Sequence, residues 1–227
     1  MIASLLATVV ISTGLATPAP PVLVQSQSIL LKRVYEAKET DRYTITADIA
    51  EGGQEFSIIA ELTVTTKKVF EDGAADVRFE ETKMSIVIGG QEMEDELHFP
   101  IQVKCDLHGM PAMLDVEEEG RSFVVFAITG FVPAKEVKVG DKFKVQWTSP
   151  DKNASVTGNG KLTEMTEIGG RKVAKLEYEV EAYPNTEDPG YLKFTSYVDV
   201  ENGKLVKAEG SVSTEEMEAS FKITLVK

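Results

Sequence analysis

The chain has 227 residues, 27% of them charged, and a formal net charge of −13 at pH 7. A phosphate backbone needs a basic footprint on its protein partner, so this charge argues against nucleic acid and against anionic lipid surfaces. Cys105 is the single cysteine, which excludes an internal disulfide framework. A chain of this length can build one substantial core, or two small lobes that share one.

Residues 1–16 read as a secretory signal peptide, although no Lys or Arg precedes the apolar core, and the alternative is an N-terminal anchor or another apolar tail. No charged side chain occurs from Ile2 to Ala16, and Gly14-Leu15-Ala16 places small residues where a signal peptidase requires them. The segment is shorter than the roughly 20 apolar residues of a membrane-spanning helix. Residues 17–28 contain several prolines and predict a flexible lead-in. We therefore expect a periplasmic or extracellular protein with no membrane span in its mature chain.

Most of the remaining chain alternates apolar and polar side chains, which is typical of half-buried β-strands. Tyr43 and Ile45 share one face of the first such segment, and Thr44 and Thr46 share the other. Turns are predicted at Glu51-Gly52-Gly53-Gln54, Glu71-Asp72-Gly73, Gly89-Gly90, Gly169-Gly170 and Asn202-Gly203. No segment sustains an apolar period of 3.6 residues, so little helix is expected.

Some segments carry more specific expectations. Leu97 to Leu107 predicts one long apolar row, with Pro100 at a sheet edge or a bulge because proline cannot donate to the ladder. Phe123 to Ile128 is apolar on both faces and predicts a strand covered on both sides. Trp147 lies on the same face of its predicted strand as Phe143 and Val145 and is expected in the core. The connection from Tyr183 to Gly190 is expected to be mobile and to contact a partner.

The second half of the chain repeats features of the first, about a hundred residues later. Glu36 to Ile45 lies over Glu136 to Val145, with identical Glu, Lys and Asp, and Leu62-Thr63 lies over Leu162-Thr163. This pattern predicts two related halves, 29–131 and 132–227, packed as one unit. The halves are expected to share strand order, strand direction and pairing register.

Histidine and cysteine offer little chemistry in this sequence. His98 and His108 have no partner at a metal-ligand spacing, and surface or turn positions are expected for both. Cys105 lies on the same face of its predicted strand as the apolar residues between Leu97 and Leu107, which predicts a buried, unreactive thiol. The alternative is a nucleophile paired with a histidine.

Carboxylates gather at Glu92–Glu96, Glu117–Glu119 and Glu215-Glu216. Solvated turns and strand edges explain such clusters, and an acid–base pair for glycoside chemistry is the alternative. No catalytic, cofactor-binding or metal-binding residue is assigned, and no cofactor is expected. The methionines of the mature chain either fill the core or line an adaptable apolar cavity. They are Met84, Met93, Met110, Met113, Met165 and Met217.

Two segments carry a resemblance to known proteins. Lys138–Phe143 and Tyr197–Leu205 resemble secreted bacterial β-proteins of unknown function. The second segment is also similar to a hairpin of the periplasmic half-barrel lipoprotein carriers. Its counterpart in the first half, Cys105–Met110, lacks the aromatic residue and has a shorter turn. The resemblance implies a curved antiparallel sheet that encloses an apolar cavity, although the sequence offers no candidate for the carriers' covering helix.

These observations predict an all-β, antiparallel protein, in a half-barrel or a sandwich of two related halves. The leading functional hypothesis is a non-enzymatic binding protein for a hydrophobic ligand or an envelope protein. The alternatives are a structural or assembly component of the cell envelope, and a hydrolase that uses carboxylates. An interior lined by Met and Phe favours the first hypothesis, exposed flat strand edges favour the second, and converging carboxylates favour the third.

Overall fold

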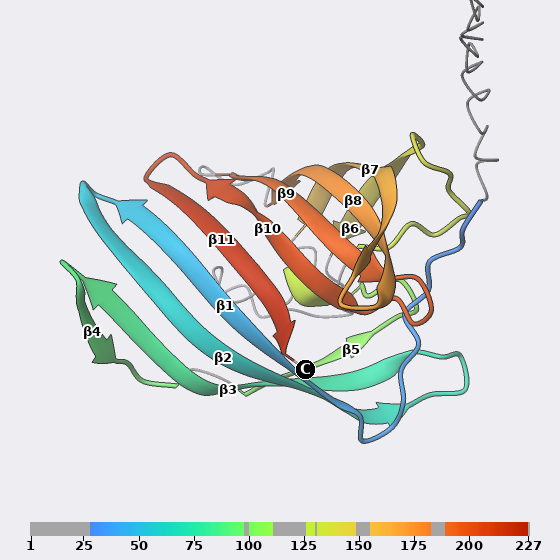
Figure 1. Cartoon of the computed structure of the whole chain (residues 1–227), viewed down its shortest axis with the longest axis horizontal. Helices are drawn as coiled ribbons and strands as arrows, with labels where there is room; N and C mark the ends of the chain where they lie inside the picture. The colour runs from blue at the N-terminus through green and yellow to red at the C-terminus, as the bar shows by residue number, and fades with distance from the viewer. Residues whose placement is uncertain are drawn as a thin grey trace, which may run out of the picture.

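The computed structural model describes residues 28–97, 100–110, 126–129, 131–148, 155–182 and 189–226. Its strands all belong to one open, curled sheet of eleven antiparallel strands (Figure 1). In chain order they are β1 (Thr40–Glu51), β2 (Gln54–Val69), β3 (Ala75–Ile88), β4 (Gln91–Glu94), β5 (Ile101–Cys105), β6 (Lys142–Thr148), β7 (Ser155–Ile168), β8 (Arg171–Ala182), β9 (Gly190–Asp199), β10 (Leu205–Ser213) and β11 (Met217–Val226).

The spatial order of the strands is β4-β3-β2-β1-β11-β10-β9-β8-β7-β6, and β5 pairs with β3 beside this path. β1 and β11 therefore join the two halves of the chain into one sheet. The prediction of an all-β antiparallel fold is confirmed, in its half-barrel form, because the single sheet curls without closing. Within the described residues, no helix has the length and apolar character needed to cross a membrane.

The connections between strands fall at two ends of the sheet, which we call the mouth and the base. The mouth holds the turns at 52–53, 89–90 and 214–216. The base holds the turns at 70–74, 169–170 and 200–204. The predicted turns are confirmed, and Gly52 and Gly53 both take the positive φ that a tight two-residue hairpin requires.

The inner face of the sheet carries one row of residues that runs straight across ten strands. From β6 to β4 the row is Phe143, Gly160, Tyr178, Phe194, Gly210, Phe221, Ala47, Ile58, Ile86 and Met93. Tyr178 stacks on Phe194 with ring centroids 4.6 Å apart. A Cβ atom at Gly160 would lie 2.3 Å from the Phe143 ring, so this glycine makes room for the aromatic side chains.

Residues 126–129, 131 and 132 pack inside the curl against β6 and β8. Phe126 packs edge-on against Trp147 at 5.0 Å and stacks on Phe131 at 5.3 Å. The Tyr178 hydroxyl donates a hydrogen bond of 2.7 Å to the Phe131 carbonyl. Residues 126–129 are helical, so the predicted strand over Phe123–Ile128 is wrong. A short run that is apolar on every side suits a buried helical turn as well as a covered strand.

The chain before β1 closes the base of the sheet. Ile29 pairs with Val137 through two backbone hydrogen bonds of 2.8 and 2.9 Å. The backbone amides of the residues that follow bond to the turns of both halves, Arg33 to the Leu107 carbonyl and Val34 to the Asn202 carbonyl, each at 2.8 Å. Leu31 lies between these contacts and is fully buried. The first residues of the half 29–131 therefore bind directly to the other half.

Buried charges reinforce this closure. The Lys204 ammonium, which is 8% exposed, bonds to Glu39 and, at 3.1 Å, to Asp41. Asp41 also faces the buried Arg33 guanidinium at 3.9 Å. Buried charges are tolerated when they are paired, and removing one partner is strongly destabilising. The base is thus held by charge pairing as well as by apolar packing.

Cys105 lies at the base end of β5 and is fully buried, as predicted. Burial raises the pKa of its thiol from the ordinary 9.0 to about 12, although the nearby Arg33 and Tyr35 act in the opposite direction. Burial also raises the pKa of Tyr43 to about 12. These groups therefore stay neutral in the folded protein at physiological pH.

The first three strands of each half follow the same order, but the pairing register differs, and the later strands do not match: β5 pairs with β3, whereas β10 pairs with β9. β1, β2 and β3 are successive neighbours, and so are β6, β7 and β8. A bulge interrupts both β2–β3 and β7–β8 near Leu62 and Leu162. However, Leu62 faces Glu81, whereas Leu162 faces Leu176, which the repeat places over Val77. The predicted common register is wrong here because the turn between β7 and β8 is shorter. The relation between halves 29–131 and 132–227 remains a prediction.

Other expectations have mixed outcomes. Trp147 is buried, and Pro100 directly precedes β5, which pairs only with β3 among the described strands. The long apolar row is wrong at its start, because Leu97 is 52% exposed and the strand begins at Ile101. The signal peptide, the lead-in to residue 27, His98, Met113, Glu117–Glu119 and the loop 183–188 lie outside the described residues.

Gly203 provides a test of the closed base. Its φ is +67°, and an added Cβ would lie 2.2 Å from the Lys32 carbonyl oxygen. We expect Gly203→Ala to lower the free energy of unfolding by about 3 kcal/mol, from left-handed strain together with overpacking. Urea denaturation followed by circular dichroism measures this change.

Gly52→Ala is the matched control, because Gly52 also has positive φ (+56°) but no atom within 4 Å of the added Cβ. Strain alone predicts a loss of about 1–2 kcal/mol there. Equal losses at both positions would show that the segment before β1 does not pack on the turn at 200–204.

The buried Cys105 thiol predicts a loss of stability at alkaline pH. The unfolded chain releases the thiol proton near pH 9 and the folded chain near pH 12, so stability is present below pH 9 and falls as pH rises between these values. We expect the fall in unfolding free energy between pH 8.5 and 10.5 to be smaller in Cys105→Ala by about 1–2 kcal/mol. Denaturation at the two pH values measures this difference. Tyrosines titrate in both proteins and cancel; equal pH dependence in the two proteins would contradict a buried thiol.

Candidate functional site

The mouth end of the inner face carries apolar side chains that do not belong to the buried core of the described residues. We call this group the mouth patch. It consists of Ile49, Phe56, Ile58, Met84, Ile86, Ile88 and Met93. The pairing register makes its members neighbours, since Ile49 faces Phe56, and Ile58 faces Ile86. Phe221 and Val212, which pack against the core, lie between the patch and the filled half of the sheet.

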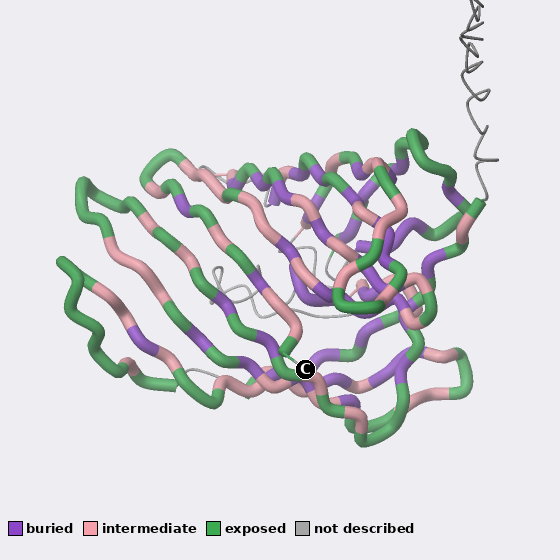
Figure 2. Tube along the Cα trace, in the orientation of Figure 1, coloured by how far each residue is buried: buried purple, intermediate pink, exposed green. Residues whose placement is uncertain are grey.

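Burial separates the patch from the rest of the inner face. Phe143, Tyr178 and Phe194 are at most 6% exposed, whereas Ile88 is 51% and Met93 is 48% exposed. The other patch members are half-buried. Figure 2 shows this gradient from purple strands at the base to pink and green strands at the mouth. A contiguous apolar surface of this kind marks a binding site on a soluble protein more often than a single exposed side chain does.

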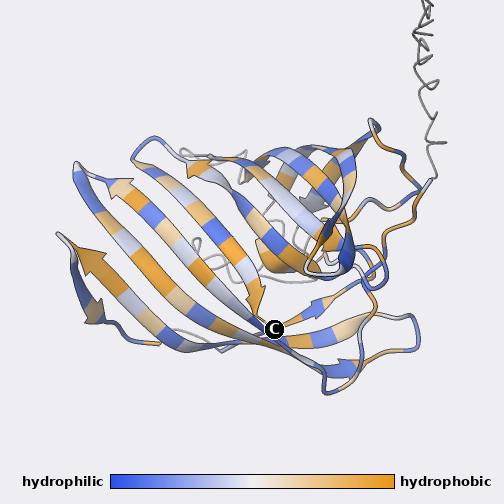
Figure 3. Cartoon of the chain, viewed as in Figure 1, coloured by the Kyte–Doolittle hydropathy of each residue, from blue (hydrophilic) through white to orange (hydrophobic). Residues whose placement is uncertain are grey.

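The local sequence explains why the patch forms on this face. Strict alternation along β1 and β2 directs Ile49 and Ile58 inward and Asp48 and Ser57 outward. Figure 3 shows the same alternation of hydrophobic and hydrophilic residues along the strands. Two methionines, Met84 and Met93, belong to the patch, while Met110 and Met165 pack against the core. Met110 and Met165 thus follow the core interpretation, whereas Met84 and Met93 lie outside the buried core.

Carboxylates surround the patch at the three hairpin tips β1–β2, β3–β4 and β10–β11. They are Asp48, Glu51, Glu55, Glu92, Glu94, Asp95, Glu96, Glu215, Glu216 and Glu218. We call them the acidic rim. The segments 47–58, 84–97 and 212–221, which form these tips, contain no Lys, Arg or His. As predicted, the clusters at Glu92–Glu96 and Glu215-Glu216 lie in turns and at a strand edge.

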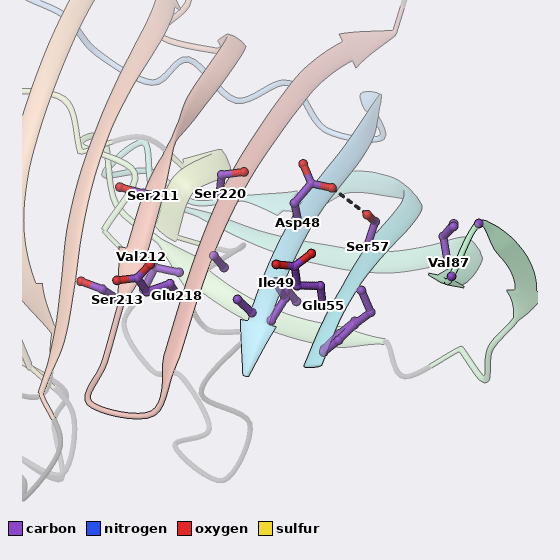
Figure 4. Close-up of a pocket in the computed structure, with 15 residues that line it drawn as sticks. Asp48, Ile49, Glu55, Ser57, Val87, Ser211, Val212, Ser213, Glu218 and Ser220 are labelled. Atoms are coloured by element: carbon purple, nitrogen blue, oxygen red, sulfur yellow. Dashed lines mark hydrogen bonds between the residues drawn. The ribbon is translucent and has the colours of Figure 1, made fainter. Parts of the chain in front are cut away.

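The outer face of the same strands is polar. Ser57, Asp48, Ser220 and Ser211 lie opposite one another across β2, β1, β11 and β10. Together with the apolar residues Ile49, Phe56 and Val212, they line an open depression of about 750 Å³ near the mouth (Figure 4). The Ser57 hydroxyl donates a hydrogen bond of 2.7 Å to Asp48, which Figure 4 marks with a dashed line. The lining of this depression is therefore both polar and apolar, and it includes the patch residues Ile49 and Phe56.

The alternative of a carboxylate-based hydrolase requires two carboxylates that lie close together, and the depression contains one candidate pair. Glu55 and Glu218 lie on either side of Ala50, in strands that flank β1. Strand spacing places their α-carbons about 10 Å apart, on a surface open to solvent. That separation follows from the register alone, and neither carboxylate sits in an apolar pocket of the kind that prepares a general acid.

The surroundings of Cys105 do not favour a nucleophile. The raised pKa of Cys105 keeps the thiol protonated, and its electrostatic neighbours include Arg33 and Tyr35. His108 lies half-buried in the turn that follows β5, where Asp106 accepts hydrogen bonds from the backbone amides of His108 and Met110. Among the residues that the structure describes, no group of three or more His, Cys, Asp or Glu is placed to hold a metal ion.

Comparisons place the chain near bacterial proteins without established function. No family model and no curated protein matches it. The hypothetical lipoprotein YmcC from Escherichia coli is 14% identical, over 86% of this chain and 90% of that one, with a TM-score of 0.29. A protein with a YmcC-like fold from Bacteroides fragilis is 10% identical, over 87% and 99% of the two chains, with a TM-score of 0.35.

A DUF1329 family protein from Desulfovibrio piger is 9% identical, over 82% and 84% of the chains, with a TM-score of 0.17. These neighbours belong to the class of bacterial proteins that the sequence resembles. All three TM-scores are below 0.5, so the function proposed for this chain does not rest on them.

The patch and the core should respond differently to truncation. Ile58 is a half-buried patch residue, and Leu62, four positions along β2, is 1% exposed in the core. We expect Leu62→Ala to cost about 3 kcal/mol of unfolding free energy and Ile58→Ala no more than about 1 kcal/mol. Chemical denaturation of both variants makes the comparison. A cost at Ile58 as large as that at Leu62 would show that the patch is packed core and not a free surface.

Proposed function

We propose that this protein binds a hydrophobic ligand on the mouth patch, as a non-enzymatic protein of the periplasm or the cell exterior. The observation that carries the proposal is the asymmetry of the inner row. One half of the row is filled by residues 126–132, and the other half presents Ala47, Ile58, Ile86 and Met93 with partial exposure. Ligand sites are mostly apolar, and this half of the sheet presents a contiguous apolar surface.

The composition of the patch supports an adaptable ligand. Methionine has a flexible, polarisable side chain that adjusts to ligands of different shape, and Met84 and Met93 lie beside Ile86 at the centre and edge of the patch. Phe56 adds a large apolar surface next to Ile49. An acyl chain or a similar apolar segment fits such a surface.

The strand edges give less support to the alternative, a structural or assembly component. β6 forms one edge of the described sheet, and its outward side chains Lys142, Lys144 and Gln146 are exposed. Charged side chains on an edge strand oppose pairing with another chain. The other edge is divided between the short strands β4 and β5. Neither edge is the long, flat, apolar template that assembly by strand addition uses.

The proposed location follows from the sequence. The apolar segment at residues 2–16 predicts export, and the resemblance to periplasmic half-barrel lipoprotein carriers predicts a ligand with acyl chains. In this proposal the segment 126–132 occupies the curl over β6 to β9. The ligand then binds beside that segment, at the mouth.

An uncharged fluorescent probe tests the proposal. N-phenyl-1-naphthylamine brightens in apolar surroundings, so titration of the full chain should give saturable fluorescence with a micromolar Kd. Ile58→Asp should weaken binding at least tenfold, because it places a carboxylate at the centre of the patch. An excess of dodecyl maltoside below its micelle concentration should displace the probe.

Ile59→Asp is the matched control. Ile59 is the next residue of β2, points to the outer face and is 36% exposed. The same substitution there changes the charge equally and should leave the Kd within about twofold of the original. Absence of saturable binding by the unmodified protein, or equal losses in the two variants, would overturn the proposal.

A further inference from the structure

We infer that the ligand of the mouth patch is a lipid whose head group carries an amine and no net negative charge. The inference rests on the proposed function and adds the head group to it. Its basis is the charge that surrounds the patch. An apolar chain on the patch leaves its head group at the mouth, beside the acidic rim.

The rim belongs to the same hairpins as the patch. Glu51 ends β1 directly after Ile49 and Ala50, and it faces Met217 of β11. Glu92 and Glu94 are the sequence neighbours of the patch residue Met93 in β4, so their side chains project to the opposite face of that strand. Glu216 lies in the turn before Met217. Carboxylates therefore gather at three tips around the patch, on both faces of the sheet, and an anionic head group placed at the mouth would meet like charge from each tip.

Cations that could neutralise an anionic head group lie elsewhere. Lys83, which faces Glu92 at 3.8 Å, and Lys222 occupy outward positions of β3 and β11, outside the three tips. The base, by contrast, carries exposed lysines at Lys67, Lys68 and Lys104. The charge is thus unevenly distributed: the three tips at the mouth carry carboxylates without cations, whereas the base carries lysines among carboxylates such as Glu71, Glu167 and Glu201. This polarity would attract an amine-bearing amphiphile to the mouth and orient it with the head group outward.

The dimensions of the patch suit a chain laid across the strands. From Met93 in β4 to Phe221 in β11, the inner row crosses four strand intervals, or about 19 Å. All five side chains of this stretch are apolar. An extended acyl chain can contact them together, with its head group within reach of the hairpin tips.

Three amphiphiles with the same twelve-carbon chain provide the test. Dodecyltrimethylammonium is cationic, dodecyl maltoside is neutral and dodecanoate is anionic. Each competes with N-phenyl-1-naphthylamine for the full-length protein, at low salt and below its micelle concentration. We expect the cation to bind best, the neutral compound to follow, and the anion to bind about tenfold more weakly than the cation. Moderate salt should reduce the difference, because the rim is exposed to solvent.

Two triple variants separate the rim from the net charge. Glu51→Gln/Glu94→Gln/Glu216→Gln removes one carboxylate from each tip around the patch. The control, Glu71→Gln/Glu167→Gln/Glu201→Gln, removes the same charge from exposed positions at the base. The rim variant should lose most of the preference for the cation while keeping its affinity for the neutral compound. The control should keep the preference.

The outcomes distinguish the inference from the function beneath it. Equal binding of all three compounds, or a preference for dodecanoate, overturns the head-group inference and leaves the hydrophobic site standing. An unchanged preference in the rim variant overturns it as well. If neither the probe nor any amphiphile binds, the proposed function fails and the inference fails with it.

Discussion

The contact that organises the molecule is the packing of residues 126–132 inside the curl of the sheet. The Tyr178 hydroxyl bonds to the Phe131 carbonyl at 2.7 Å, and Phe126 packs against Trp147. An open sheet leaves one apolar face without a partner, and burying an aromatic side chain of this kind contributes about 1.5–3 kcal/mol. These residues cover the apolar inner face on one half of the sheet. The apolar surface stays accessible on the other half, which they do not cover.

The two ends of the sheet differ for the same reason. At the base, the chain before β1 pairs with Val137 and bonds to the turns of both halves, so packing and charge pairing close the structure. At the mouth, two-residue turns such as Gly52-Gly53 end the strands without covering segments among the described residues. Carboxylates keep these tips soluble. An apolar patch beneath an acidic rim is the result.

Alternation along the chain predicted most of the sheet. Alternation placed Tyr43, Ile45 and Trp147 on the inner face, because side chains of a strand point to its two faces in turn. Glycine pairs located the hairpins, because tight turns require a positive φ that glycine adopts readily. The same alternation makes Ile58 an inward residue. It could not show that Ile58 stays accessible while Leu62 is buried, because that difference depends on distant segments packing onto the sheet.

Other features were beyond local pattern. The run at Phe126–Ile128 is apolar in every direction, so periodicity alone could not distinguish a helical turn from a covered strand. The pairing register of β7 and β8 depends on the length of their turn. The alignment of the two halves therefore predicted the wrong partner for Leu162. The acidic rim was visible as separate clusters, but only the spatial order of β3, β1 and β11 brings those clusters around one patch.

Methyl NMR with a bound apolar molecule tests the central claim most directly. In protein with labelled isoleucine methyl groups, addition of N-phenyl-1-naphthylamine should shift the signals of Ile49, Ile58 and Ile86. The signals of the core residues Ile45 and Ile128, and of Ile59 on the outer face, should stay in place. Shifts confined to the core or to the outer face, or no shifts at saturating probe, would contradict a binding site at the mouth of the sheet.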